Sequence, residues 1–546
     1  MLNGMNFRRI RWAIAGVLCT VGLWASGQTT QTVQILRAQE IRRHPSLPGI
    51  QRLLGDVQLG WRSTTLTCDS AWRFDDGAFE VMGRVVMVDG RGGRLFAERM
   101  QLDPVATRVE AQGGSEPVRW KSDGETVSGA AFGYGLETRD LVWNQTAQLT
   151  QRDSLTGKTR QLSSMRGQML IDADQLNLGG NVQLEDEDQL LRSDSLQIFQ
   201  LTAEQQWVLC GPTSLWSRDG AREFHADAGT LNLAGGSGQI LATGDQRAWF
   251  RQEDVISAGD ALTLVDSTHQ TIRGRVFVTD TLASFGLWGD ALVMEPDAFW
   301  LTGSGADDRA HVSQGQEQGQ EQGQEQGQGR GDDAPWWVVG DTIWRTSGPQ
   351  GDIMHAWPDA RMAQGTSRGA CDTLVWTEAD SILTFLGMPV LLADGSRLTS
   401  DSLRLQLMAT GVDSLVARGH VCMTSALEEG PDSLHHTISG RSLDGFFGDE
   451  GALNQIRVAG NSEVLQFDDD GRRLNHLQSS RLNVDFADGE VQDILLLGQP
   501  SGVWTSTNQA DQTALPGCPH LPPPADLAHP VRPQLQSRHK RLQTGP

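Results

Sequence analysis

The stretch LLGDVQLGWRSTTLTCDSAWRFDDGAFEVMGRVVMVDGRGGRLFAERMQLD, residues 53 to 103, decides the fold. In short runs such as GDVQL (55 to 59) and AERMQL (97 to 102), apolar residues alternate with polar or small ones. Alternation with a period of two predicts β-strands that each bury one face. Gly and Asp separate the runs, as in FDDG (74 to 77), and predict tight turns. The stretch therefore predicts a series of β-hairpins.

One strand pattern recurs along the chain: a small or polar residue, often after Asp or Ser, and then two apolar residues one position apart. Examples are SDSLQI (193 to 198) and GDALTL (259 to 264). Apart from a gap after residue 292, successive copies lie 20 to 41 residues apart, with most steps near 30, which is a period typical of repeat architectures. The first apolar residues of the copies are Trp72, Met100, Leu141, Leu176, Leu196, Leu231, Leu262, Leu292, Leu374, Leu403, Leu443 and Leu482.

A second strand, which follows a Gly, lies between these copies. It reads GDVQL (55 to 59), GRVVMV (83 to 88), GNVQL (180 to 184), GRVFV (274 to 278) and GHVCM (419 to 423). The Gly-x-Val triplet alone is weak evidence, because a chain with 62 Gly contains several such triplets by chance. Its interleaving with the first strand is the informative feature. No long window shows the 3.6-residue apolar stripe of a helix, so we predict an all-β protein.

Charge excludes one class of partner. The formal net charge of −23 would repel a phosphate polymer, so nucleic acid is not predicted as a partner. The same charge disfavours broad adhesion to anionic lipid head groups. Any lipid that this protein holds is expected to be held through its apolar part.

The first residues predict export. Arg8, Arg9 and Arg11 precede an uncharged run from Trp12 to Trp24, which is followed by small residues before Gln28. This arrangement is typical of a secretory signal peptide, which we place at 1–27. The apolar run is shorter than the roughly 20 residues of a permanent membrane helix, although a retained anchor is the alternative.

Composition predicts how the rest is divided. The segment 303–334, with GQEQGQEQGQEQGQG at its centre, has almost no apolar side chain to bury and is predicted to be a disordered linker. It would separate a first β array, 28–302, from a second, 335–505. The tail, 506–546, is rich in Pro, ends with basic residues and lacks the strand pattern, so it is predicted to be extended or mobile.

No motif for catalysis or metal binding stands out. The sequence has no nucleophile elbow at a plausible strand-to-helix junction and no phosphate-binding loop, and the pair His435-His436 has no carboxylate at a metal-ligand spacing. Acids recur at the same place in several repeats, which favours a turn role, although folding could still assemble paired carboxylates. We therefore predict no enzyme, no cofactor and no metal. The recurring acids are Asp194, Asp260, Asp290, Asp372 and Asp401.

The cysteines remaining after signal cleavage form an odd set without C-x-x-C spacing. This spacing does not support a metal site. One or two disulfides are possible in an oxidising compartment, but sequence alone cannot pair the thiols, so no particular bridge is predicted. Buried thiols acting as small hydrophobic groups are the expected alternative. These residues are Cys68, Cys210, Cys371, Cys422 and Cys518.

The stretch 53 to 103 resembles the organic-solvent-tolerance (OstA) domain shared by the lipopolysaccharide transport proteins LptA and the N-terminal part of LptD. The order of a Gly-x-Val strand, a Cys-Asp-Ser-Ala strand, an apolar-x-Gly-x-Val strand and an Ala-x-x-apolar-x-apolar-Asp strand carries the resemblance. It extends more weakly to 456 to 504. The resemblance implies an elongated antiparallel β-jellyroll, a V-shaped trough of stacked hairpin repeats.

The function that this resemblance implies is periplasmic lipopolysaccharide transport, or outer-membrane assembly, by a protein that shields lipid A acyl chains in an apolar trough. The expected partners are lipopolysaccharide, other transport-bridge components at the inner and outer membranes, and further copies of the chain joined end to end. The expected location is the periplasm, in association with the outer membrane. A structural or adhesive surface β-solenoid without lipid is the alternative, and a carbohydrate-processing β-helix enzyme is a third reading.

The residues predicted to line the lipid groove are the apolar pairs of the recurring strand, because a continuous apolar interior is what an acyl chain needs. Sequence does not decide which strand face points inward. The predicted groove residues are Met100, Leu102, Leu176, Leu178, Leu196, Ile198, Leu231, Leu233, Leu262, Leu264, Leu292, Met294, Leu403, Leu405, Leu482 and Val484.

Overall fold

The computed structural model describes most of the chain between residues 33 and 518. The signal peptide predicted at 1–27 and the tail beyond 518 lie outside the described residues. Residues not described within this span are 45, 48, 104, 106, 123, 153–157, 200–204, 233–236, 244–245, 266–268, 281–284, 304–308, 316–335, 394, 409–410, 428–433, 449–451, 469–470, 488–489 and 508–513.

The described residues are almost entirely β-structure, with 44 strands and a single turn of 3-10 helix at Ile171–Ala173. All the strand pairings between them are antiparallel, as in β3 with β4 and β41 with β42. The predicted all-β, antiparallel, hairpin-based fold is confirmed. Within the described part of the chain, no helix is long and apolar enough to cross a membrane.

The chain forms two compact units. The first unit comprises residues 1–120 and 133–137, and the second comprises residues 121–132 and 138–546. The strands of the first unit, together with two that are shared at its boundary, are β1 (Gln34–Arg37), β2 (Glu40–Arg43), β3 (Gln51–Trp61), β4 (Thr64–Arg73), β5 (Phe79–Val88), β6 (Arg94–Asp103), β7 (Arg108–Gln112), β8 (Val118–Ser122) and β10 (Ala131–Gly135).

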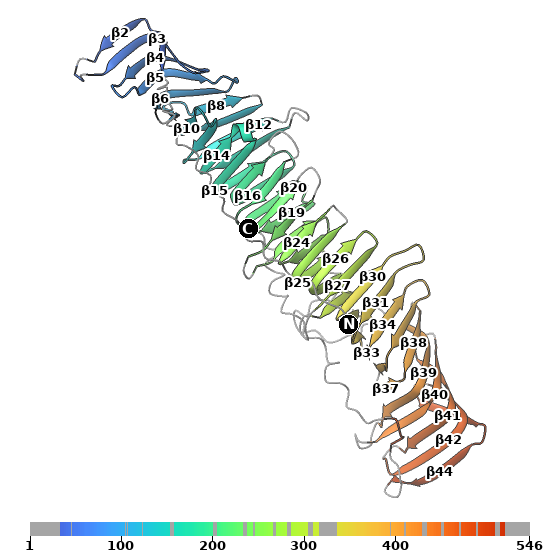
Figure 1. Cartoon of the computed structure of the whole chain (residues 1–546). Helices are drawn as coiled ribbons and strands as arrows, with labels where there is room; N and C mark the ends of the chain where they lie inside the picture. Colours follow the sequence, from blue (N-terminus) through green and yellow to red (C-terminus); the bar gives the residue numbers. More distant parts are fainter. Residues whose placement is uncertain are drawn as a thin grey trace, which may run out of the picture. The chain divides into compact units, whose positions relative to one another are not determined.

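The second unit contains two walls of strands, and its strands follow one another in a ladder (Figure 1). Wall 1 contains β11 (Asp140–Trp143), β14 (Arg166–Leu170), β17 (Gln206–Leu209), β20 (Ala228–Asn232), β21 (Ser237–Leu241), β24 (Ala261–Leu264), β27 (Ala298–Thr302), β30 (Thr342–Thr346), β31 (Ile353–Trp357), β34 (Thr373–Thr377), β35 (Ile382–Leu386), β38 (Ser402–Met408) and β43 (Glu490–Leu497). Wall 2 contains β9 (Glu125–Gly129), β12 (Ala147–Arg152), β13 (Thr159–Ser164), β18 (Thr213–Ser217), β19 (Arg222–Ala226), β22 (Ala248–Gln252), β23 (Val255–Gly259), β28 (Ala310–Gln314), β29 (Trp336–Gly340), β32 (Ala360–Gln364), β33 (Ser367–Cys371), β36 (Val390–Ala393), β37 (Ser396–Thr399) and β44 (Ser501–Ser506).

Long strands run through both walls. Their two halves pair with different neighbours; in β16, for example, residues 196 to 199 pair with β17 and residues 189 to 193 pair with β18. The long strands of the second unit are β15 (Gln175–Glu185), β16 (Gln189–Phe199), β25 (Gln270–Asp280), β26 (Phe285–Glu295), β39 (Gly411–Ala426), β40 (His435–Phe447), β41 (Leu453–Phe467) and β42 (Arg473–Ala487).

The chain passes from one wall to the other along one edge, which we call the spine. In β25 the pairing register shifts between Arg273 and Val276, and the two residues between them, Gly274 and Arg275, have φ of 68° and 48°. Such left-handed backbone favours Gly and produces a bulge that bends the strand. The opposite edge holds hairpin tips that each belong to a single wall, such as the tip between β18 and β19. We call this edge the mouth.

The recurring acids help to build the spine. Asp260 and Asp401 each lie opposite the bulge Gly of the next strand, and their backbone N–H groups donate to the carbonyls of that Gly and of the residue before it. Arg275 forms an ion pair with Asp260, and His420 lies 3.0 Å from Asp401. The predicted structural role of these two acids therefore agrees with their positions in the structure.

The predicted linker does not interrupt the sheet. Residues 310 to 314, inside the range 303–334, form β28, which pairs with β29 directly across the segment. In wall 1, β27 pairs in register with β30. The strand ladder therefore has paired neighbours on both sides of the undescribed residues 316–335.

The structure supplies the pairing that the sequence left open, because Cys422 of β39 is bonded to Cys518 across a separation of 96 residues. The bond fixes residues 514 to 518 on an apolar cluster that includes Leu465, Phe467 and Leu474. Part of the tail predicted to be mobile is therefore packed. Sequence spacing could not show this pairing, because folding alone brings the two thiols together.

Candidate functional site

The predicted groove residues of the second unit share one surface, the inner face of wall 1. An unbroken row nearest the spine joins Leu178, Leu196, Leu262, Leu292, Leu403 and Leu482 through direct cross-strand partners. A parallel row nearer the mouth holds Leu176, Ile198, Leu231, Leu264, Met294, Leu405 and Val484.

The row nearest the spine is almost completely buried, with Leu262, Leu292 and Leu482 all 0% exposed. The row nearer the mouth is looser, because Leu264 and Met294 are only half-buried. Met100 and Leu102, in the first unit, are buried as well. Leu233 lies outside the described residues. The sequence pattern thus selected side chains that share one face. The structure shows that this face points inward, which the spacing could not decide.

Wall 2 supplies the facing apolar layer. Leu191, Leu215 and Phe224 are successive cross-strand partners, and the same row continues through Val278, Leu287 and Val312. These side chains are buried, as their partners in wall 1 are. Two apolar faces that meet without a ligand exclude water and pack together. The interior is therefore enclosed in this conformation and is not an open channel.

Contacts between the walls close the mouth at two places. Trp336 of wall 2 and Trp376 of wall 1 have ring centroids 6.4 Å apart. Farther along, the guanidinium of Arg160 in wall 2 lies 5.7 Å from the ring centre of Trp207 in wall 1. Each such contact is worth on the order of 1 kcal/mol. Among the described residues, the chain joins the walls at the spine, and the mouth is held by these two ring contacts and by a hydrogen bond that Arg160 donates to Gln205, the residue before β17.

A half-buried carboxyl group also lies at the mouth. Glu125, on wall 2, accepts a hydrogen bond of 3.1 Å from Gln151. Burial and, second, the negative charge of Asp174 raise the pKa of Glu125 to about 7, although the bond from Gln151 lowers it. Asp174 follows the 3-10 turn at the tip of wall 1 and has φ of 51°. Charge at this part of the mouth therefore changes near neutral pH.

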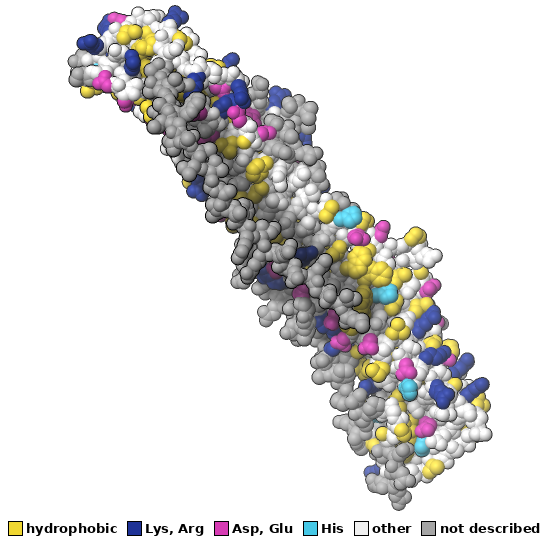
Figure 2. Space-filling model, viewed as in Figure 1, with side chains coloured by type: hydrophobic (Ala, Val, Ile, Leu, Met, Phe, Trp, Pro, Cys, Tyr) yellow, Lys and Arg dark blue, Asp and Glu magenta, His cyan; other side chains and the backbone are white. Residues whose placement is uncertain are grey.

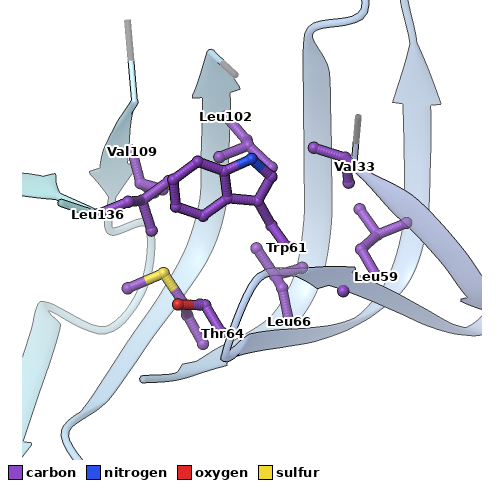
Figure 3. A pocket seen from close by; sticks show the side chains of 10 residues that line it. Val33, Leu59, Trp61, Thr64, Leu66, Leu102, Val109 and Leu136 are labelled. Atoms are coloured by element: carbon purple, nitrogen blue, oxygen red, sulfur yellow. The ribbon is translucent and has the colours of Figure 1, made fainter. Parts of the chain in front are cut away.

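The first unit has a small apolar pocket. Its cavity volume is about 10 Å³, hardly enough for one water molecule. The Trp61 indole lies among Leu102, Val109 and Leu136 (Figure 3). Leu102 is one of the predicted groove residues. Ordinary ligand pockets measure roughly 300–1,000 Å³, so this pocket would have to widen to admit an acyl chain.

The thiols outside the disulfide have no reactive environment where they are buried. Burial is the main cause that raises the pKa of Cys68 to about 11 and that of Cys371 to about 12. Both groups therefore stay protonated at neutral pH, and a protonated thiol is a poor nucleophile. Within the described ranges, no group of three or more His, Cys, Asp and Glu side chains is placed to hold a metal ion.

Two features escaped the sequence analysis: the disulfide and a row of aromatic rings on the outside of wall 1. The rings could have been noticed, because Trp and His occupy the positions between inner apolar residues in FWLT (299 to 302) and MHAW (354 to 357).

No family model matches the sequence, and no curated protein matches it either. The resemblance to the OstA domain therefore stays a prediction.

Proposed function

We propose that this chain is a periplasmic lipopolysaccharide-transport or outer-membrane-assembly protein that shields lipid A acyl chains between its two walls. One observation carries the proposal. An unbroken row without polar side chains runs along the inner face of wall 1 nearest the spine, and the described strands pass from one wall to the other at the spine. A mouth held by weak contacts can part to admit a hydrocarbon chain, which then replaces the contacts between the walls.

The free energy of burying an acyl chain favours its entry between the walls. Burial of an acyl chain contributes about 0.8 kcal/mol per methylene, so a dozen methylenes give on the order of 10 kcal/mol. The mouth contacts seen here, at roughly 1 kcal/mol each, are smaller than this sum. Catalytic groups are not required for this role. The protein is proposed to act as a carrier and not as an enzyme.

Two further observations support the proposed location and the proposed partners. The Cys422–Cys518 disulfide suits an oxidising compartment such as the periplasm, in agreement with the predicted export signal. At the end of the ladder, β43 and β44 each pair with β42, and Leu497, Val503 and Trp504 are exposed on them. Strand edges of this kind are templates for another chain, so we propose bridge components or further copies of this chain as partners there.

The decisive experiment places a photo-crosslinking amino acid at Leu264, on the inner face near the mouth, and at its neighbour Thr263, on the outer face. In cells that make lipopolysaccharide, the Leu264 position is expected to capture it and the Thr263 position is not. The two positions differ by one residue, so export and fold are matched. Equal capture at both positions, or capture at neither in a folded protein, would contradict the proposal.

The enclosed interior favours a second candidate function, a structural or adhesive β-solenoid displayed at the cell surface. A sealed core is what such a protein would need. Protease added to intact cells separates the two functions, because a surface protein is cleaved and a periplasmic carrier is protected until the outer membrane is opened.

A further inference from the structure

An uncharged patch lies on the outer face of wall 1. β27, β30, β31 and β34 each point one residue of the same cross-strand row into the core, so the residues that alternate with it point outward. These inward residues are Leu301, Ile343, Ala356 and Leu374. We call these outward residues the aromatic patch. They are Ala298, Trp300, Thr302, Thr342, Trp344, Thr346, Ile353, His355, Trp357, Thr373, Val375 and Thr377.

Four rings form a connected group in this patch. Trp300 pairs across the strands with Trp344, and their ring centroids lie 6.4 Å apart with planes inclined by 30°. Trp344 pairs in turn with His355 at 5.1 Å, and Trp357 lies 6.4 Å from His355. Trp300 and Trp357 are 38% and 36% exposed. Figure 2 shows hydrophobic side chains gathered beside His over the strands labelled β30 and β31 in Figure 1.

The chemistry around the rings is neutral and rich in hydroxyl groups. Five of the twelve outward side chains are Thr, and none is Asp, Glu, Lys or Arg, although these four types make up 21% of the chain. Burial lowers the pKa of His355, so this ring also carries no charge at neutral pH. Flat rings offer faces for apolar C–H groups, and Thr hydroxyls both donate and accept hydrogen bonds.

The area of the aromatic patch and the net charge of the chain limit which ligand can bind there. Four strands at about 4.8 Å spacing, each about 15 Å long, present roughly 300 Å². A stable protein interface needs about 800 Å² on each partner, so a folded protein is a poor fit. An anionic lipid surface would be repelled by the net charge of −23. A sugar chain has apolar C–H faces, many hydroxyl groups and a width that suits a few strands.

We propose that the aromatic patch binds a neutral oligosaccharide of a few sugar units, with pyranose faces stacked on Trp300, Trp344 and Trp357 and hydroxyl groups bonded to the surrounding Thr side chains. The site lies on the opposite face of wall 1 from the apolar interior. The inference does not rest on the proposed lipid function, and either can fail without the other.

Isothermal titration of the full mature chain tests the proposal with five neutral hexasaccharides: the α-1,4-, β-1,4- and β-1,3-linked glucans, a xylan and a mannan. At least one is expected to bind with a Kd of about 1 mM or tighter. The variant W300A/W344A is expected to bind at least about tenfold more weakly. The matched control is W504A, because Trp504 is exposed on β44, away from the patch, and its loss should leave the affinity unchanged.

Two results would overturn the oligosaccharide proposal. If none of the five sugars binds the folded chain up to about 10 mM, the proposal is overturned. Binding that W300A/W344A and W504A weaken equally would also overturn it, since the sugar would then not recognise this patch. A melting curve of each variant shows that it is folded, and W344F, which keeps an aromatic face, is expected to retain most of the affinity.

Discussion

At the scale of single residues, the bulges of the spine give the Gly-x-Val triplet its meaning. Gly274 and Arg275 both have positive φ, and a Cβ at Gly274 would lie 2.2 Å from Asp260 Oδ2. Only Gly fits this backbone and this close approach. The Asp260 side chain occupies the space that any residue larger than Gly at position 274 would need, so the two positions depend on each other. The triplet is weak evidence in the sequence, but it marks the corner of the fold.

Glu125 allows a prediction of pH dependence. In the folded protein, its raised pKa keeps the proton bound up to about pH 7, whereas the ordinary value is 4.5. Between these values the folded state binds more protons than the unfolded state, so the free energy of unfolding falls as pH rises. This loss is absent below pH 4.5 and complete above pH 7. It amounts to at most about 3 kcal/mol.

Glu125→Gln removes this ionisation. We expect the variant to be about 1 to 3 kcal/mol more stable than the parent at pH 8 and almost equal to it at pH 4. Urea unfolding at the two pH values measures the difference. Glu187→Gln is the control, because Glu187 is exposed on a hairpin tip of wall 2. A gain for Glu125→Gln that is the same at both pH values would show that burial does not raise the pKa of this group.

At the scale of elements, the C-terminal segment 514 to 518 depends on its disulfide. The bond closes a long loop, and loss of such a bond costs about 2 to 5 kcal/mol. Without it, Leu515 should leave Leu465 and Phe467, and this end of wall 2 should expose apolar surface. Cys518→Ser is therefore expected to lower the melting temperature and to increase binding of an apolar dye.

Cys210→Ser is the matched control for that experiment, since Cys210 is an exposed free thiol at the spine. Its melting temperature should stay at the parent value. If Cys518→Ser melts like Cys210→Ser, the segment contributes nothing to stability.

The elements also show what could be read from sequence. Alternation with a period of two predicted the strands, and the pairs such as Leu262 with Leu264 lie on one inner face because the pleat repeats every second residue. Sequence did not reveal that the interior is closed, because closure depends on contacts between distant residues such as Trp336 and Trp376. The partner of Cys422 stayed hidden for the same reason.

At the scale of the whole second unit, strand pairing gives information about domains that composition does not give. The Gln-Gly-Glu segment looks like a boundary, yet Gln314 pairs directly with Trp336, and Leu301 pairs with Ile343 in the other wall. Composition reports that a segment has nothing to bury. It does not report whether the strands on either side pair with each other, which is what decides a domain boundary.

Replacing residues 316–335 with a four-residue loop tests this continuity. A shorter closed loop costs less entropy, so we expect the variant to be about 1 to 1.5 kcal/mol more stable than the parent. The row from Leu292 through Leu301 to Ile343 should remain unbroken, so crosslinking at Leu264 should match that of the parent. If the two sides of the segment were separate domains, joining them so tightly would strain both, and the variant would lose stability or unfold in two steps. Urea unfolding, followed by Trp fluorescence, distinguishes these outcomes, and a scrambled segment of the original length is the control.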